Sequence, residues 1–204
     1  MHPYSYLCPV NNENSMKRLL MLMMIGCLTG LCPPRATAQP AGVVLDTLLV
    51  PYVDGRGTNH EGVIICNKSI AKDLTEIFTE LYRAKYPIER IRPISEFGND
   101  DEQSMQANNS SCYCYRKVQG SSKLSKHAQG LAIDINPLYN PCVTPQKGGS
   151  TLVEPATGAA YADRNAEFPY KITKGDLCYR LFIKHGFKWG GEWKSKKDYQ
   201  HFER

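Results

Sequence analysis

Apolar residues between positions 69 and 86 return every three or four residues. They are Ile70, Leu74, Ile77, Phe78, Leu81 and Tyr82. This spacing aligns them on one face of an amphipathic helix, which Asn67 or Ser69 can cap and Pro87 stops. The pattern predicts a helix over residues 69–86 that packs the core and carries no chemistry.

Three further segments have a shorter pattern. Residues 88–95 are typical of a strand, and residues 100–107 of a short helix whose early acidic residues favour its N-terminus. Another helix begins after Thr173, which can cap it, and ends at Gly186. We expect His185, in its last turn, to interact with the helix dipole rather than with a metal.

A short β-type segment at residues 132–135 places a carboxylate among isoleucines. Side chains alternate between the two faces of a strand, so Asp134 lies opposite Ile133 and Ile135. If the isoleucines face the core, the carboxylate of Asp134 faces a site.

Two stretches lack a regular pattern. Residues 39–66 predict an irregular N-terminal arm that wraps the domain, and we expect its His60 to be solvated. Residues 136–170 are rich in Pro, Gly and Asn, and a loop of this length in a compact domain is usually functional. The second stretch is therefore expected to wall a substrate cleft.

Length and composition indicate one globular domain. The chain has 204 residues, of which 42% are hydrophobic and 22% charged, so neither a disordered chain nor a polytopic membrane protein is favoured. The formal net charge of +5 is spread along the sequence. We therefore expect no nucleic-acid partner, whereas a mildly basic surface suits an acidic polymer such as a cell-wall glycopeptide.

The N-terminal segment has the pattern of an export signal. Met16 and two basic residues precede an apolar stretch at 19–31, and small residues with signal-peptidase spacing end at Ala38. The apolar stretch is too short for a stable membrane span. Residues 1–38 are thus expected to be a signal peptide, with Met16 as a plausible start, and the protein to be periplasmic or extracellular. A second interpretation makes Cys27 an acylated lipoprotein cysteine.

Removal of that signal leaves five of the eight cysteines. They are Cys66, Cys112, Cys114, Cys142 and Cys178. An odd number cannot pair completely, and the spacing matches neither a disulfide framework nor a cysteine-ligated zinc site. We expect Cys112 and Cys114 to be structural, and the sequence leaves the pairing of all five open.

Two distant segments each combine a histidine with an acid. The first contains His127 and Asp134, and the second contains Asp198 and His201. A catalytic zinc keeps three protein ligands and one open position, so two imidazoles and one carboxylate are a suitable set. His127 can reach Asp134 if the chain bends at Gly130, where no side chain obstructs a bend.

The spacing of Asp198 and His201 suggests a general base. Residues three apart lie together on a helical turn but point apart along a strand. A turn here would bring Asp198 beside the attacking water, from which it would take a proton to deliver to the leaving amine.

These segments resemble the M15 family of zinc peptidases, which includes D-Ala-D-Ala carboxypeptidases, vancomycin-resistance D,D-dipeptidases and L-alanyl-D-glutamate endopeptidases. The resemblance is carried by Ser125-x-His127-x-x-Gly130-x-Ala132-x-Asp134, by Gly190-Gly191-x-Trp193 and by Asp198-x-x-His201-Phe202-Glu203. It covers most of residues 60–204. By this resemblance residues 67–204 are the zinc peptidase domain, with an α+β fold in which helices pack on one side of a small antiparallel sheet, as in the hedgehog signalling domain.

The same resemblance implies roles for single residues. Zn²⁺ would be held by His127, Asp134 and His201, with Asp198 as the catalytic base. The arginine that polarises the substrate carbonyl would be Arg116, with Arg92 as the alternative. Ser125 and Trp193 would contact the substrate, and Glu203 would orient a ligand.

The function that follows is hydrolysis of peptidoglycan stem peptides, by an L-alanyl-D-glutamate endopeptidase or by a D,D- or L,D-carboxypeptidase. The alternative is a zinc-binding module without turnover that recognises cell-wall peptides or a protein partner. Retention of an acid at Asp198 favours the enzyme. The sequence leaves open which bond is cut, the biological role and the oligomeric state.

Overall fold

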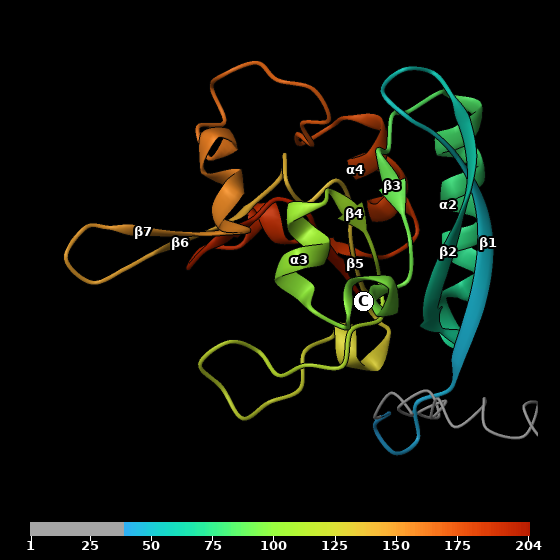
Figure 1. Cartoon of the computed structure of the whole chain (residues 1–204), viewed down its shortest axis with the longest axis horizontal. Coiled ribbons are helices and arrows are strands. Elements are labelled where there is room, and N and C mark those ends of the chain that lie inside the picture. The colour runs from blue at the N-terminus through green and yellow to red at the C-terminus, as the bar shows by residue number, and fades with distance from the viewer. Residues whose placement is uncertain (1–38) are drawn as a thin grey trace, which may run out of the picture. The chain divides into compact units, whose positions relative to one another are not determined.

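The computed structural model describes residues 39–204, which form an α+β fold as the sequence predicts (Figure 1). Within this range the strands are divided among four small sheets, three antiparallel and one a parallel pair. No helix in the described range is long and apolar enough to cross a membrane. The expected signal peptide and Cys27 lie outside the described residues, so the export signal stays a prediction.

The expectation of an irregular arm at residues 39–66 is wrong. Strands β1 (Leu45–Val53) and β2 (Asn59–Asn67) form a long antiparallel hairpin. The turn is stabilised by Asp54, whose Oδ1 accepts hydrogen bonds from the backbone N–H groups of Arg56 and Thr58, both at 2.9 Å. An Asx-type turn of this kind pairs two strands that have no clear alternation of their own.

Helix α2 (Ala71–Arg83) confirms the prediction from the apolar spacing. A short 3-10 turn at Lys68–Ile70 precedes it, and the side chain of Asn67 accepts from the N–H of Ser69 at that turn. The helix covers one face of the β1–β2 hairpin and buries its apolar side chains there (Figure 1).

The strand predicted at residues 88–95 is much shorter in the structure. Only β3 (Arg90–Ile91) pairs, in parallel with β4 (Asn109–Ser110), because Pro93 and a 3-10 turn at Ile94–Phe97 follow at once. Helix α3 (Asp101–Gln106) begins where expected, and Asp100 caps it by accepting from the N–H of Gln103.

A three-stranded sheet lies at the centre of the C-terminal half. Its order is β5 (Ala132–Asp134), β10 (His201–Glu203) and β8 (Lys188–Trp189). Helix α4 (Leu177–Lys184) contacts α2 and β8, and its cap is Asp176 rather than the predicted Thr173. Asp176 directly precedes the first turn, and its side chain accepts from the N–H of Tyr179, which has no partner within the helix. Thr173 lies too far before the helix to make this hydrogen bond.

The stretch at residues 136–170 is not a plain loop. It contains strands β6 (Cys142–Pro145) and β7 (Thr151–Glu154), which project as a hairpin (Figure 1), and then a 3-10 helix at Ala156–Tyr161. Strand β6 also pairs with β9 (Lys197–Asp198). This pairing ties the hairpin to the segment just before His201.

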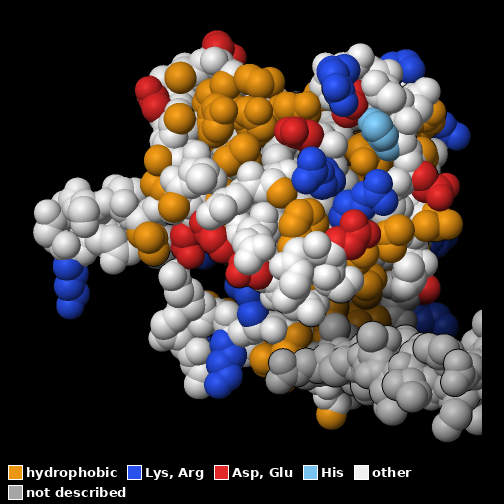
Figure 2. Space-filling view, in the orientation of Figure 1, with side chains coloured by type: hydrophobic (Ala, Val, Ile, Leu, Met, Phe, Trp, Pro, Cys, Tyr) orange, Lys and Arg blue, Asp and Glu red, His pale blue; other side chains and the backbone are white. Residues whose placement is uncertain are grey.

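On the face that Figure 2 shows, the charged side chains are dispersed, as they are along the sequence. Figure 2 shows Lys and Arg side chains interspersed with Asp and Glu over the face in view, with no extended area of one sign.

Candidate metal centre

The register between β5 and β10 brings an acid and a histidine together. His201 is paired directly with Asp134, and both side chains leave the same face of the sheet. On the other face, Ile133 and Phe202 enter the core. The alternation predicted for residues 132–135 is thus correct, and it directs the carboxylate of Asp134 into a site.

His127 reaches the same site from a 3-10 turn at His127–Gln129. Gly130 ends this turn with φ 66°, in the left-handed region that favours glycine. A Cβ at this position would lie 2.5 Å from the backbone nitrogen of Asn67 at the end of β2. Gly130 therefore permits both the bend before β5 and the close contact with the hairpin.

The three side chains form a tight buried cluster. His201 Nδ1 lies 3.1 Å from Asp134 Oδ1, His127 Nε2 lies 3.3 Å from Asp134 Oδ2, and the two ring nitrogens are 3.1 Å apart. Only 2%, 5% and 6% of His127, Asp134 and His201 are exposed. One atom from each residue lies within 4.8 Å of the others, close enough to ligate one ion.

Neighbouring acceptors orient both rings toward the centre of the cluster. His127 Nδ1 lies 2.7 Å from the carbonyl oxygen of Cys112, and His201 Nε2 lies 3.3 Å from a carboxylate oxygen of Glu203. Each of these nitrogens must donate, so the lone pairs of His127 Nε2 and His201 Nδ1 face each other across the cluster. Such outward acceptors are typical of metal-bound histidines.

The electrostatics of the cluster favour a positive charge at its centre. Burial opposes ionisation of Asp134, but the two imidazoles overcome this and hold the pKa of its carboxyl well below the ordinary value. Burial also disfavours a charged His201, yet Asp134 and Glu203 raise the pKa of its ring to about 10. The residues therefore fit a divalent cation, which would replace a proton between facing lone pairs.

Asp198 lies beside the cluster, but not on a helical turn. Asp198 ends β9, a two-residue bend follows, and His201 begins β10. Gly190 lets both residues approach, because a Cβ there would lie 2.8 Å from Cβ of Asp198 and 3.2 Å from Cβ of His201. The predicted juxtaposition is thus achieved by two strands packed on one glycine.

Two buried polar atoms near the cluster have no hydrogen-bond partner among the described residues. They are Oδ1 of Asp198 and Oε1 of Gln200, and both residues line one pocket with the cluster. Buried polar atoms are seldom left unsatisfied, so this pocket is suited to a polar ligand. The other oxygen of Asp198, Oδ2, lies 3.4 Å from Nζ of Lys196.

The pocket has a volume of about 450 Å³, and the cluster lies in its lining. Cys142, Thr144 and Glu154 of the β6–β7 hairpin form part of its wall, which agrees with the expectation that residues 136–170 wall a cleft. Sequence reasoning missed Glu154 and Lys196. Glu154 lies on β7, and the pairing of β6 with β7 and with β9 brings both residues to the pocket. No local sequence pattern predicts this pairing.

Of the residues predicted to contact the substrate, Arg116, Ser125 and Trp193 line the pocket, and Arg92 does not. Arg116 lines the pocket, and its Nε lies 2.7 Å from Asp101 Oδ2, whereas the alternative Arg92 lies in another pocket. Ser125 is buried in the lining and its Oγ accepts from the N–H of His127 at 3.2 Å. Trp193 also lines the pocket, with its ring centroid 5.1 Å from that of His201.

Several other residues of the fold have structural contacts. Trp189 is buried and donates to the carbonyl oxygen of Tyr199 at 2.9 Å. His185 ends α4 and lies 3.0 Å from Asp73 Oδ1 on α2, so it joins the two helices. The five cysteines of residues 39–204 are all unpaired and buried, and burial raises the pKa of the Cys66 and Cys114 thiols to about 12.

Two imidazoles and one carboxylate in the lining of a polar pocket are typical of metal-dependent hydrolases. Residues 119–204, which carry the whole cluster, match the M15 peptidase family model described as D-alanyl-D-alanine carboxypeptidase. No curated protein and no solved structure matches the chain significantly. The resemblance to the M15 peptidases is thus confirmed over residues 119–204, which are less than half of the chain.

Proposed function

We propose that the protein is a zinc metallopeptidase that hydrolyses peptidoglycan stem peptides after export. The observation that carries this proposal is the buried cluster of His127, Asp134 and His201, with the unpartnered Oδ1 of Asp198 in the same pocket. A purely structural cluster of ion pairs would not explain why a buried oxygen of a further acid beside it has no hydrogen-bond partner.

Zinc is the ion that suits this ligand set best. Nitrogen from two neutral imidazoles and oxygen from one carboxylate are the ligands of several catalytic zinc sites. Bound there, zinc would polarise both the attacking water and the scissile carbonyl. Glu203 would hold the ring of His201 in the orientation that presents Nδ1.

Asp198 is proposed as the general base. Its unpartnered Oδ1 would accept a proton from the attacking water and then transfer it to the leaving amine. Lys196 lies against the opposite oxygen at 3.4 Å and would hold the carboxylate with Oδ1 toward the pocket.

Arg116 is proposed to stabilise the negative charge that develops on the carbonyl oxygen. The ion pair with Asp101 holds one edge of its guanidinium, and the rest is available to the pocket. Trp193 and Ser125 are proposed to contact the peptide, since both line the same pocket.

The family description points to cell-wall stem peptides as the substrate class. Both acidic and basic side chains line the pocket, and Lys196 and Arg116 lie close enough to Glu154 to act on its charge. Such a lining suits a stem peptide, which carries both carboxylate and amino groups. Within this class we propose either an L-alanyl-D-glutamate endopeptidase or a D,D- or L,D-carboxypeptidase.

The test is incubation of the zinc-loaded full chain with defined muropeptides, with the products identified by mass spectrometry. We expect cleavage that a chelator abolishes and zinc restores. In Asp198→Asn the rate should fall by about 10²–10⁴ while the zinc content stays unchanged. Asp163→Asn, an exposed acid outside the pocket lining, is the matched control and should keep full activity. Absence of cleavage by a zinc-loaded sample would favour a binding module without turnover.

A further inference from the structure

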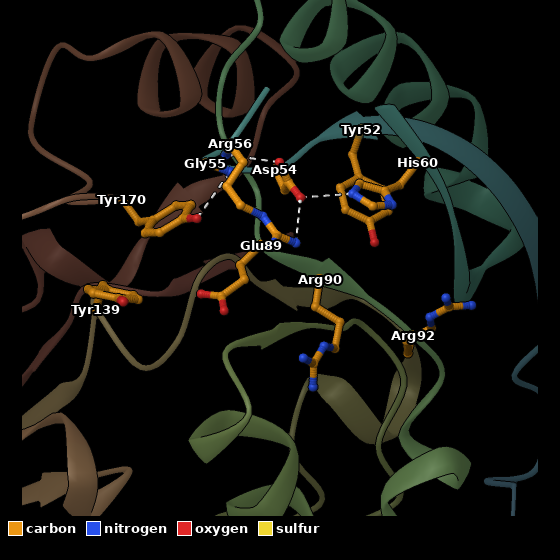
Figure 3. A pocket seen from close by; sticks show the side chains of 10 residues that line it. All are labelled: Tyr52, Asp54, Gly55, Arg56, His60, Glu89, Arg90, Arg92, Tyr139 and Tyr170. Carbon is orange, nitrogen blue, oxygen red and sulfur yellow. Dashed lines mark hydrogen bonds and ion pairs between the residues drawn. The ribbon is translucent and has the colours of Figure 1, made fainter. Parts of the chain in front are cut away.

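A second pocket shares no lining residue with the pocket of the metal centre. It has a volume of about 500 Å³ and is formed by the β1–β2 turn, by β3 and by loop residues (Figure 3). Its lining includes three arginines and three tyrosines, which are Arg56, Arg90, Arg92, Tyr52, Tyr139 and Tyr170. We call it the arginine pocket. Its composition is typical of a site for an anionic ligand.

Arg90 and Arg92 are held in place by backbone contacts. Ile91 between them is fully buried, so the alternation of the strand sends both arginines away from the core. Asn109 accepts from the N–H of Arg92 at 2.8 Å and donates to its carbonyl oxygen at 3.0 Å. The two arginines thus start from a fixed segment of backbone.

Neither of these two guanidiniums has an ion-pair or hydrogen-bond partner within residues 39–204, and Figure 3 draws no contact to either. A guanidinium presents several N–H donors that match a carboxylate or phosphate. The charge of Arg90 and Arg92 is therefore available to a ligand.

One acid of the pocket, Asp54, already has partners for both of its oxygens. It accepts from two backbone amides of its own turn, lies 3.0 Å from His60 Nε2, and lies 3.5 Å from a guanidinium nitrogen of Arg56. The ring of His60 stacks on Tyr52 at a centroid distance of 5.0 Å. Asp54 and His60 thus build a wall of the pocket rather than neutralise Arg90 and Arg92.

Because of Glu89, a ligand of this pocket should also carry hydrogen-bond donors. Its carboxylate lies between Tyr139 and Arg90 in the middle of the pocket (Figure 3). One oxygen accepts from Nδ2 of Asn108 at 2.8 Å, and the other is available to a hydroxyl group. A dense run of phosphates, as in a nucleic acid, would meet repulsion from Glu89.

Arg92 and one pair of tyrosine rings lie at opposite ends of the pocket. In Figure 3 the rings of Tyr139 and Tyr170 lie at one end, with their centroids 4.9 Å apart, and Arg92 lies toward the other end. The arginines are spread along the pocket instead of surrounding one point. An extended ligand with repeated charges fits this arrangement better than a single small anion.

We propose that the arginine pocket binds an acidic polysaccharide. Anionic groups of successive sugars lie against Arg90 and Arg92, a hydroxyl group donates to Glu89, and one sugar ring packs on Tyr139 and Tyr170. This site goes beyond the proposed peptidase activity and does not depend on it, because its lining contains no residue of the metal centre.

Calorimetric titration of the full chain tests the proposal. The ligands are a short oligogalacturonate, a phosphorylated oligomannose, a neutral oligosaccharide of equal length, inorganic phosphate and a single-stranded oligodeoxynucleotide. We expect an acidic saccharide to bind more tightly than the other three, and the first two ligands separate carboxylate from phosphate recognition. In R90Q/R92Q its Kd should rise at least about tenfold.

The matched control is K147Q/K184Q, which removes two exposed positive charges outside the pocket lining and should keep the Kd. Thermal melting checks folding, and Arg92→Gln alone, at an exposed position, serves if the double variant is unstable. The proposal is overturned if neither acidic saccharide binds, if R90Q/R92Q binds as tightly as the unaltered chain, or if the control loses binding equally. Tighter binding of phosphate or DNA also overturns it.

Discussion

The cluster of His127, Asp134 and His201 and the Asp54–His60 pair both place a histidine about 3 Å from an aspartate, yet their surroundings differ. At the cluster, Asp134 contacts two imidazoles whose other nitrogens are occupied by Cys112 and Glu203. At the β1–β2 turn, Asp54 contacts one imidazole, and backbone amides take its other oxygen. The first arrangement leaves lone pairs directed at one point, and the second leaves none.

Exposure separates the two regions further. His60 keeps 35% of its side chain exposed and stacks on Tyr52, whereas His127 is 2% exposed. Water can solvate His60 in either charge state, but the buried cluster has only its own ligands to balance charge. The contact of a histidine with an acid is therefore a weak sign of a metal, and the direction of the remaining lone pairs is a stronger one.

The largest expected effect comes from the ligands themselves. His127→Ala or His201→Ala should abolish stoichiometric zinc binding, since two remaining ligands cannot hold a catalytic zinc. His60→Ala should leave zinc binding unchanged. The measurement is the zinc content of purified variants by mass spectrometry after dialysis. Equal zinc loss in His60→Ala would mean that the β1–β2 turn also takes part in metal binding.

Gly190→Ala should disturb both stability and the metal centre. The new Cβ would lie 2.6 Å from the carbonyl oxygen of Asp198, so β9 must move away from residue 190. We expect a loss of about 1–3 kcal/mol in the free energy of unfolding and a weaker zinc affinity. Gly158→Ala, which creates a similar contact with Leu138 at 2.8 Å outside the pocket lining, is the control. It should lower stability and keep the affinity for zinc.

Glu203→Gln tests the outer acceptor of the cluster. An amide accepts from His201 Nε2 less strongly than a carboxylate, so zinc affinity should fall by about 10–100-fold while folding is retained. Competition with a chromogenic chelator measures the affinity. The exposed Glu61→Gln on β2 controls for the charge. An unaltered affinity in Glu203→Gln would show that the ring of His201 is oriented by packing alone.

Local patterns in the sequence predicted some elements well. The apolar spacing of α2 and the alternation around Asp134 depend on nearby residues, and both were correct. The β1–β2 hairpin was missed because exposed residues such as Leu49 interrupt the alternation of polar and apolar positions. Its strands are specified by pairing with each other and with α2, which no local window contains.

The site shows the same division. The residue types of the cluster could be selected from the sequence, since two imidazoles and a carboxylate suit zinc. The spacing of Asp198 and His201 suggested a helical turn, but the structure has two strands that converge on Gly190. Glu154 and Lys196 reach the pocket only through the pairing of β6, β7 and β9, so they could not be predicted.

The smallest expected effect concerns Asp54 at the β1–β2 turn. Contacts with His60 and with the amides of Thr58 and Arg56 hold the pKa of Asp54 well below its ordinary value. A carboxyl whose pKa is lower in the folded state stabilises the protein above the unfolded pKa of about 4, and the stabilisation is lost as the pH falls through the folded pKa. Asp54→Asn should therefore lower the Tm at pH 7.

The difference in Tm between this variant and the unaltered chain should shrink as the pH is lowered from about 5 toward 2. Melting followed by circular dichroism over this range measures it, with Asp163→Asn as an exposed control whose Tm should follow that of the unaltered chain. Zinc content should stay constant in Asp54→Asn at neutral pH. A Tm difference that does not depend on pH would mean that Asp54 acts through its backbone contacts alone, and that its charge stabilises nothing at the β1–β2 turn.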